Sequence, residues 1–175
     1  MKTLLVLRHA KAENPASGMS DFDRALNERG RRQAQACGEF VKNRDLKVDL
    51  VLSSPALRAR ETSESLKSVA GLNGDIRFDQ RIYEASSHTL FELLSEIDEA
   101  ASPLMLVGHN PGLEDLIHML TGRAEHLSPA TIAKISFAFD QWNQVEENTG
   151  VLDWVCNQTN SPLTDRVPGI HATFL

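Results

Sequence analysis

The sequence predicts a single α/β domain: a three-layer α/β/α sandwich with a mostly parallel sheet and a C-terminal antiparallel hairpin. Residues 4–7, 48–52 and 104–107 form short apolar runs, a pattern typical of strands buried on both faces. Amphipathic helical stretches separate these runs, and this alternation favours parallel β-α-β units. Residues 131–139 and 151–155 predict two strands joined without a helix, which favours the hairpin.

Length and composition agree with one domain. The chain has 175 residues, against about 150 for a typical domain, so we expect one domain over residues 1–156. Residues 157–175 contain Pro162 and Pro168 and little periodicity, and they predict a tail that packs on the surface or is partly disordered. Hydrophobic residues make up 41% and charged residues 24%, which excludes a fibrous or wholly disordered chain.

The net charge limits the expected partners. Eighteen Lys and Arg residues against 24 Asp and Glu residues give a formal charge of −6. A chain without an overall basic field is not expected to bind nucleic acid or an anionic membrane. Any site for an anion must therefore come from a local basic cluster.

The start of the chain predicts a cytoplasmic protein. Its apolar run stops at Arg8-His9, short of the roughly 7–15 residues of a signal peptide. No run approaches the roughly 18–20 apolar residues of a membrane span. Cys37 and Cys156 make neither a disulfide framework nor a zinc site, and both are expected to be small core residues.

Two helices are expected after the first and second predicted strands, one after each. One is expected over residues 28–44, with Asn27 as its N-cap and apolar side chains at helical spacing on one face. The other is expected over residues 55–69, with Ser54 as its N-cap and Pro55 at the first helical position.

Two more helices flank the third apolar run. One is expected over residues 89–100, where Thr89 and Glu92 fit a capping box and leucines recur on one face. The other follows Pro111 and ends at Gly122. This order completes the alternation of strand and helix before the hairpin.

Three predicted strands lead into residues suited to phosphate chemistry. The first runs into Arg8-His9, the second is followed by Arg58 in the first helical turn, and the third by His109. In an open α/β sheet, ligands bind outside the carboxyl ends of parallel strands, near helix N-termini. If the three strands are parallel, two Arg and two His side chains converge on one place. This is the local cationic cluster that the acidic composition requires.

These segments resemble the motifs of a known family. Leu7-Arg8-His9-Ala10 resembles the signature strand end of the histidine phosphatase superfamily, which has the phosphoglycerate mutase-like fold. Residues 54–62 resemble its second motif and residues 108–110 its third, in matching order and spacing over most of the chain. Residues 21–30 and the short length are similar to the SixA-type phosphohistidine phosphatases.

The resemblance implies a role for four residues. His9 is expected to attack phosphorus and become a phosphohistidine intermediate, which water then hydrolyses. Arg8 and Arg58 are expected to bind the equatorial oxygens, and His109 to donate a further hydrogen bond to the phosphoryl group. The surrounding cations lower the pKa of a histidine, which keeps the nucleophile neutral. Because side chains neutralise the phosphoryl charge, we expect no metal and no other cofactor.

Two further residues have two interpretations each. Glu84 lies about where many family members carry a proton donor, and the alternative is a surface or loop-anchoring carboxylate. Asn14 lies near the place of a family phosphate-binding Asn, but its spacing from Arg8 departs from the common one, and the alternative is a turn residue. Ala10 stands where the family usually has Gly; both residues are small.

The expected function is a metal-independent phosphatase that removes a phosphoryl group from phosphohistidine on a protein. Imidazole leaves with less help than an alkoxide, so the reaction tolerates a missing general acid. Only about 26 positions separate Asp79 from Met105, so we expect an open site that suits a phosphorylated side chain. The alternatives are a phosphatase for small phosphate esters and a phosphate-recognition module without turnover, against which His9 argues.

One competing motif is set aside. Asp21-Phe22-Asp23 matches the Asp-x-Asp of the metal-dependent haloacid dehalogenase phosphatases. Those aspartates should directly follow the first strand, whereas here a loop with Ser and Gly intervenes.

Overall fold

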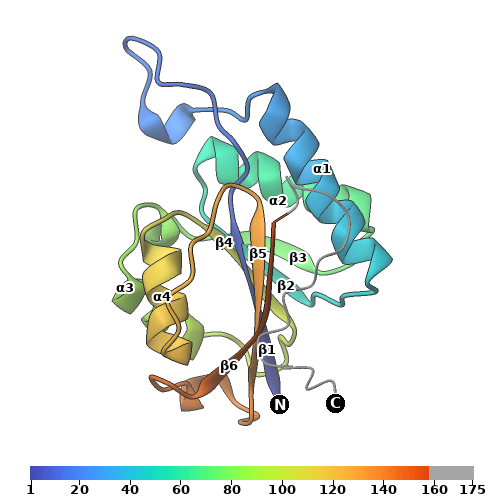
Figure 1. Cartoon of the computed structure of the whole chain (residues 1–175), viewed down its shortest axis with the longest axis vertical. Helices are drawn as coiled ribbons and strands as arrows, with labels where there is room; N and C mark the ends of the chain where they lie inside the picture. The colour runs from blue at the N-terminus through green and yellow to red at the C-terminus, as the bar shows by residue number, and fades with distance from the viewer. Residues whose placement is uncertain (158–175) are drawn as a thin grey trace, which may run out of the picture.

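The computed structural model describes residues 1–157 and confirms the α/β/α sandwich (Figure 1). Its middle layer is a six-stranded sheet in the order β3-β2-β4-β1-β5-β6. The strands are β1 Lys2–Arg8, β2 Leu50–Ser53, β3 Asp75–Phe78, β4 Leu104–Gly108, β5 Thr131–Phe137 and β6 Gly150–Asn157. The helices are α1 Glu28–Asn43, α2 Leu57–Ala70, α3 Ser87–Ser95 and α4 Gly112–Thr121. Short 3-10 helices are η1 Asp21–Asp23, η2 Gln80–Ile82 and η3 Trp142–Gln144.

The sheet is parallel on one side and antiparallel on the other. β1 pairs with β4, β4 with β2 and β2 with β3, all in parallel. β5 runs antiparallel to β1, and β6 runs antiparallel to β5, which confirms the C-terminal hairpin. The hairpin connection was expected to lack a helix, but it contains η3, because Trp142 is buried and its Nε1 donates to the Ala101 carbonyl oxygen at 2.7 Å.

Side-chain alternation along the central strands divides the core in two. Leu4 and Val6 of β1 pack in the layer of α3 and α4, whereas Leu5 and Leu7 pack in the layer of α1 and α2. The two helix pairs lie on opposite faces of the sheet (Figure 1). Burial on both faces explains why these strands are uninterrupted apolar runs in the sequence.

Ser54 was predicted to be the N-cap of the second helix, and this prediction is wrong. Its Oγ accepts from the Ala56 amide at 3.3 Å and lies 2.8 Å from Nε2 of His109. The chain therefore becomes helical only at Leu57, and Ala56 occupies the N-cap without a side-chain cap. The Ser54 hydroxyl thus hydrogen-bonds to His109 and does not cap the helix.

The third helix is also shifted. Ser86 is its N-cap, with Oγ accepting from the Thr89 amide at 3.2 Å, so the predicted capping box of Thr89 and Glu92 is wrong. The helix ends at Ser95 rather than at residue 100, because the Ile97 amide bonds to the Leu94 carbonyl in a tightened last turn.

Several other predictions differ from the structure in smaller ways. The first helix ends one residue early, at Asn43, and the fourth ends at Thr121, with the predicted end residue Gly122 as its C-cap. β3 has no counterpart among the predicted strands, because it is a four-residue edge strand whose side chains alternate between exposed and half-buried. Cys37 lies in the core, whereas Cys156 is only half-buried on β6. Of the predicted tail, Asn157 belongs to β6, and the remainder lies outside the described residues.

Candidate active site

The parallel register brings the ends of β1, β2 and β4 to one edge of the sheet. Arg8 is the partner of Gly108, and Ser53 is the partner of Val107, so the residues that follow these strands meet. The rings of His9 and His109 have centroids 4.9 Å apart. The predicted convergence of these strand ends is therefore present in the fold.

His9 has one ring nitrogen bound to the backbone and the other facing an arginine. Its Nδ1 lies 2.8 Å from the Ala10 carbonyl oxygen, an acceptor only, which assigns the ring proton to Nδ1. Nε2 then carries the lone pair and accepts from Nε of Arg58 at 3.3 Å. Burial, and after it the neighbouring cationic groups, lower the pKa of His9 to about 3. At neutral pH the ring is uncharged, and Nε2 carries the lone pair that a nucleophile requires.

His109 has the opposite arrangement of its ring nitrogens. Its Nδ1 lies 3.3 Å from Nη2 of Arg58, which only donates, and its Nε2 lies 2.8 Å from Oγ of Ser54. The ring proton therefore belongs on Nε2. Burial and the charge of Arg58 lower the pKa of His109 to about 4. An anion beside Nδ1 would favour a second proton on the ring, and the ring could then donate to that anion.

Arg58 connects the two histidines through one edge of its guanidinium group. The side chain is only 5% exposed. Nε and Nη2 face His9 and His109, respectively, and this edge presents two parallel donors of the kind that bind a phosphate bidentately. The other edge is occupied by Asp21: Nη1 donates to its carbonyl oxygen at 2.6 Å and Nη2 to Oδ2 at 2.9 Å.

Asp21 belongs to η1, in the long connection between β1 and α1, and it holds Arg58 in place. Its Oδ2 also accepts from the Tyr83 hydroxyl at 2.9 Å, and its Oδ1 from Nε of Arg24 at 2.9 Å. Burial alone would raise the pKa of Asp21, but hydrogen bonds from Tyr83, Arg24 and Arg58 hold it at about 2. The carboxylate thus stays ionised at physiological pH.

Arg8, at the end of β1, has a buried donor without a partner in the described part of the chain. Its Nη1 donates to the Leu127 carbonyl oxygen at 2.7 Å, while Nε is buried without a hydrogen-bond partner among residues 1–157. Burial lowers the pKa of Arg8, and Glu114 partly opposes that effect. A buried donor without a partner is costly, and an anionic ligand at this site would satisfy it.

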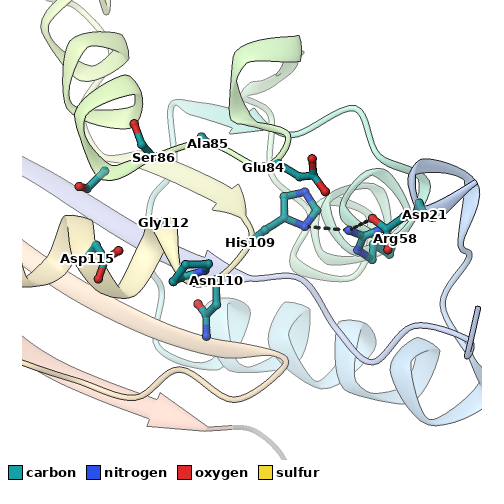
Figure 2. A pocket seen from close by; sticks show the side chains of 11 residues that line it. Asp21, Arg58, Glu84, Ala85, Ser86, His109, Asn110, Gly112 and Asp115 are labelled. Atoms are coloured by element: carbon teal, nitrogen blue, oxygen red, sulfur yellow. Dashed lines mark hydrogen bonds and ion pairs between the residues drawn. The ribbon is translucent and has the colours of Figure 1, made fainter.

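A cleft of about 620 Å³ opens beside this group (Figure 2). Its lining includes Arg58, His109 and Asp21, and also Glu84, Ser86 and Asp115, together with neighbouring backbone. In the view of Figure 2, Glu84 and His109 appear toward one end of the lining and Asp115 toward the other.

The wall that carries Glu84 depends on a close backbone approach. A Cβ on Gly112 would lie 2.1 Å from the Ala85 carbonyl oxygen, so only glycine lets the start of α4 pack against this segment. Glu84 itself has φ of 51°, in the left-handed region that non-glycine residues rarely adopt. Packing against α4 thus fixes the position of the Glu84 backbone at the cleft edge.

The structure brings together four of the six predicted site residues: Arg8, His9, Arg58 and His109. Glu84 lies at the edge of the cleft. Asn14 does not join them: it is exposed in the connection after β1 and does not line the cleft.

Three residues of the site were not predicted for it: Asp21, Tyr83 and Ser54. Ser54 directly follows β2, and a signal was available there, because the residue after a buried parallel strand faces the site. The bond between Asp21 and Arg58 joins residues 37 positions apart, and no local pattern indicates it.

Residues 1–157 contain no group of three or more His, Cys, Asp or Glu side chains that could hold a metal ion. They also contain no helix that is long and apolar enough to cross a membrane.

Comparison with known proteins gives a family match and several similar structures. Residues 4–111 match the profile of the histidine phosphatase superfamily, branch 1. A crystal structure of a candidate phosphohistidine phosphatase SixA from Agrobacterium tumefaciens superimposes with a TM-score of 0.73 and 32% identity, covering 78% of this chain and 92% of that one. A mycobacterial glucosyl-3-phosphoglycerate phosphatase is similar in fold, with a TM-score of 0.66 and 20% identity over 87% of this chain and 98% of that one.

Among curated sequences, an uncharacterized protein of Mycobacterium tuberculosis is 35% identical over 105 residues. The matched segment covers 60% of this chain, and it spans 63% of the length of that relative.

Proposed function

Because the chain belongs to the histidine phosphatase superfamily, we propose that it hydrolyses phosphohistidine on a protein through a covalent intermediate on His9. One observation carries the proposal: Nε2 of His9 is a lone-pair donor held beside the two-donor edge of Arg58. A phosphoryl group bound by that edge would lie next to the nucleophile. The similarity to the Agrobacterium SixA structure supports phosphohistidine as the substrate class.

In the proposed first step, Nε2 of His9 forms a bond to phosphorus while the bond to the leaving imidazole breaks. The Ala10 carbonyl oxygen keeps the proton on Nδ1, so the phosphorylated ring carries a positive charge that this oxygen stabilises. Arg8, Arg58 and His109 bind the phosphoryl oxygens while negative charge builds on these oxygens. The leaving imidazole takes a proton from solvent.

In the second step, water attacks phosphorus, the bond to Nε2 breaks, and inorganic phosphate leaves. His9 returns to its neutral form, as its lowered pKa favours. The phosphoryl charge is met by side chains, so we propose that neither step needs a metal. We also propose that the reaction takes place in the cytoplasm, where phosphorylated protein side chains are the partners.

Trapping the intermediate tests this proposal. We expect acid-labile, alkali-stable phosphate on His9 during turnover, and essentially no turnover by His9→Ala. His88→Ala, which removes an exposed histidine from α3, is the matched control and should behave as the wild type. Label on another residue of the His9→Ala protein would overturn the assignment, as would loss of activity in excess EDTA that a divalent metal restores.

Hydrolysis of small phosphate esters is the second candidate, favoured by Glu84 at the cleft edge. The similar fold of the mycobacterial glucosyl-3-phosphoglycerate phosphatase is compatible with it. An alkoxide leaves poorly without a proton donor, so a general acid at Glu84 would matter for esters far more than for phosphohistidine.

The two candidates are separated by Glu84→Gln. If Glu84 is a proton donor, the loss in rate on alkyl phosphates should exceed the loss on phosphohistidine by roughly 10²-fold. Equal and large losses on both substrates would contradict the phosphohistidine preference. A protein that binds phosphate but shows no His9-dependent turnover would be a recognition module instead.

A further inference from the structure

The cleft beside the phosphoryl-binding residues offers room for the leaving group of a substrate. Arg58 is bonded on its far edge to Asp21, and His9 and His109 are largely buried. The 620 Å³ cleft adjoins Arg58 and His109, and it is where the part of a substrate beyond phosphorus can lie. The charges along its walls therefore act on the leaving group.

These walls carry three carboxylates, Asp21, Glu84 and Asp115, and the guanidinium group of Arg58. Asp21 is neutralised by Arg58 and Arg24, with ion pairs of 2.9 and 2.7 Å. Glu84 and Asp115 form no ion pair with any other residue in the range 1–157, and both are exposed at the cleft. Once a phosphoryl group compensates Arg58, the rest of the cleft is negative.

We propose that Glu84 and Asp115 are specificity-determining residues that select phosphoryl donors with a cationic leaving group; this inference rests on the proposed function. An unpaired carboxylate attracts a cation and repels an anion, and charge repulsion is an efficient way to reject a competitor. The imidazole ring of phosphohistidine is cationic once solvent protonates its second nitrogen, so it meets the requirement. Phosphate esters that carry a carboxylate beyond the ester oxygen do not.

Three small phosphates serve as probes of the cleft, and they differ in the charge of the part beyond the ester oxygen. This part is cationic in phosphocholine, anionic in phosphoglycolate and neutral in p-nitrophenyl phosphate. For each protein we would measure kcat/KM on all three and compare the phosphocholine-to-phosphoglycolate ratio with that of the wild type. The intrinsic reactivities of the two probes are the same for every protein, so they cancel when the ratio of a variant is divided by that of the wild type. Calorimetric affinities for the same two charged phosphates give the comparison independently of turnover.

We expect Glu84→Gln and Asp115→Asn each to lower this ratio by about three- to five-fold, the effect of one exposed charge pair. The wild-type ratio should also fall at high salt, because exposed charges are screened. Glu92→Gln is the matched control: it removes the same charge from an exposed position of α3 outside the cleft, and its ratio should equal that of the wild type.

The outcomes separate this inference from the proposed function. His9-dependent hydrolysis of p-nitrophenyl phosphate reports on the phosphatase, whatever the ratio. An unchanged or increased ratio in both cleft variants, in rate and in affinity, would overturn the selection of cationic leaving groups while leaving the phosphatase intact. A lowered affinity ratio in a protein without turnover would support the selection and contradict the phosphatase.

Discussion

The phosphoryl-binding residues and the cleft beside them differ in how their side chains are held. His9, Arg58 and His109 are buried and bonded to one another or to backbone, and each ring nitrogen has an assigned partner. Glu84 and Asp115 are exposed and form no ion pair within the described part of the chain. Packing and hydrogen bonds thus orient the phosphoryl-binding side chains, whereas the selection that we propose for the cleft rests on charge.

After loss of the nucleophile itself, the largest effect should come from removing the central guanidinium group. Arg58→Ala is expected to lower kcat/KM by roughly 10²–10³ on every substrate alike, because it removes two donors to the phosphoryl group. Arg60→Ala, which removes a half-buried arginine two residues further along α2 and outside the cleft, is the control and should have little effect. A loss that varies strongly with the leaving group would mean that Arg58 belongs functionally to the cleft.

The buried histidines should make stability depend on pH. The pKa of His9 is about 3 and that of His109 about 4, both below the ordinary value of 6.5, so the unfolded chain binds more protons between these limits. Stability is therefore fully present above pH 6.5 and falls as the pH drops toward 4, by up to about 1.4 kcal/mol per pH unit for each ring.

Urea unfolding at several pH values checks this expectation. His9→Gln should lose less stability on acidification than the wild type, and His88→Gln, which replaces an exposed ring, should lose as much as the wild type. A pH dependence that survives in His9→Gln and His109→Gln alike would show that other groups are responsible.

Removing the residue that holds Arg58 should have a smaller effect. Asp21→Ala frees the outer edge of the guanidinium group, and the resulting misalignment is expected to cost roughly tenfold in kcat/KM. Asp21→Asn should be intermediate, since its amide oxygen can still accept from Arg58. Asp23→Ala, an exposed neighbour in η1 with the same charge, is the control. An equal loss in Asp23→Ala would indicate a change in local folding rather than in Arg58.

The smallest effect concerns the backbone of the cleft wall. Glu84 adopts a left-handed conformation with φ of 51°, so Glu84→Gly should stabilise the fold by about 0.5–1 kcal/mol in thermal or urea unfolding. The same change removes a cleft carboxylate and should lower the preference for cationic leaving groups. A gain in stability together with a loss in selectivity is expected where strain serves function. Lower stability of Glu84→Gly would mean that the carboxylate holds this segment in place.

The fold could be predicted from the sequence wherever burial is uniform. The apolar runs of β1, β2 and β4 are buried on both faces, so their composition alone indicates central strands. β3 could not be predicted, because an edge strand of four residues alternates between exposed and half-buried and lacks that composition. The capping residues were wrong at two helices. Ser54 bonds to His109, a partner that only packing makes available, whereas at α3 the cap is Ser86, three residues before Thr89.

The sequence by itself determined which residues follow the central strands, and parallel pairing necessarily brings Arg8, His9 and His109 to one edge of the sheet. Only the tertiary structure decided how those groups are oriented. The Ala10 carbonyl assigns the proton of His9, Ser54 orients His109, and Asp21 occupies the outer edge of Arg58. The reason is physical: composition and periodicity report which face of a strand or helix is buried, whereas a hydrogen bond depends on distances between segments that are remote in the chain.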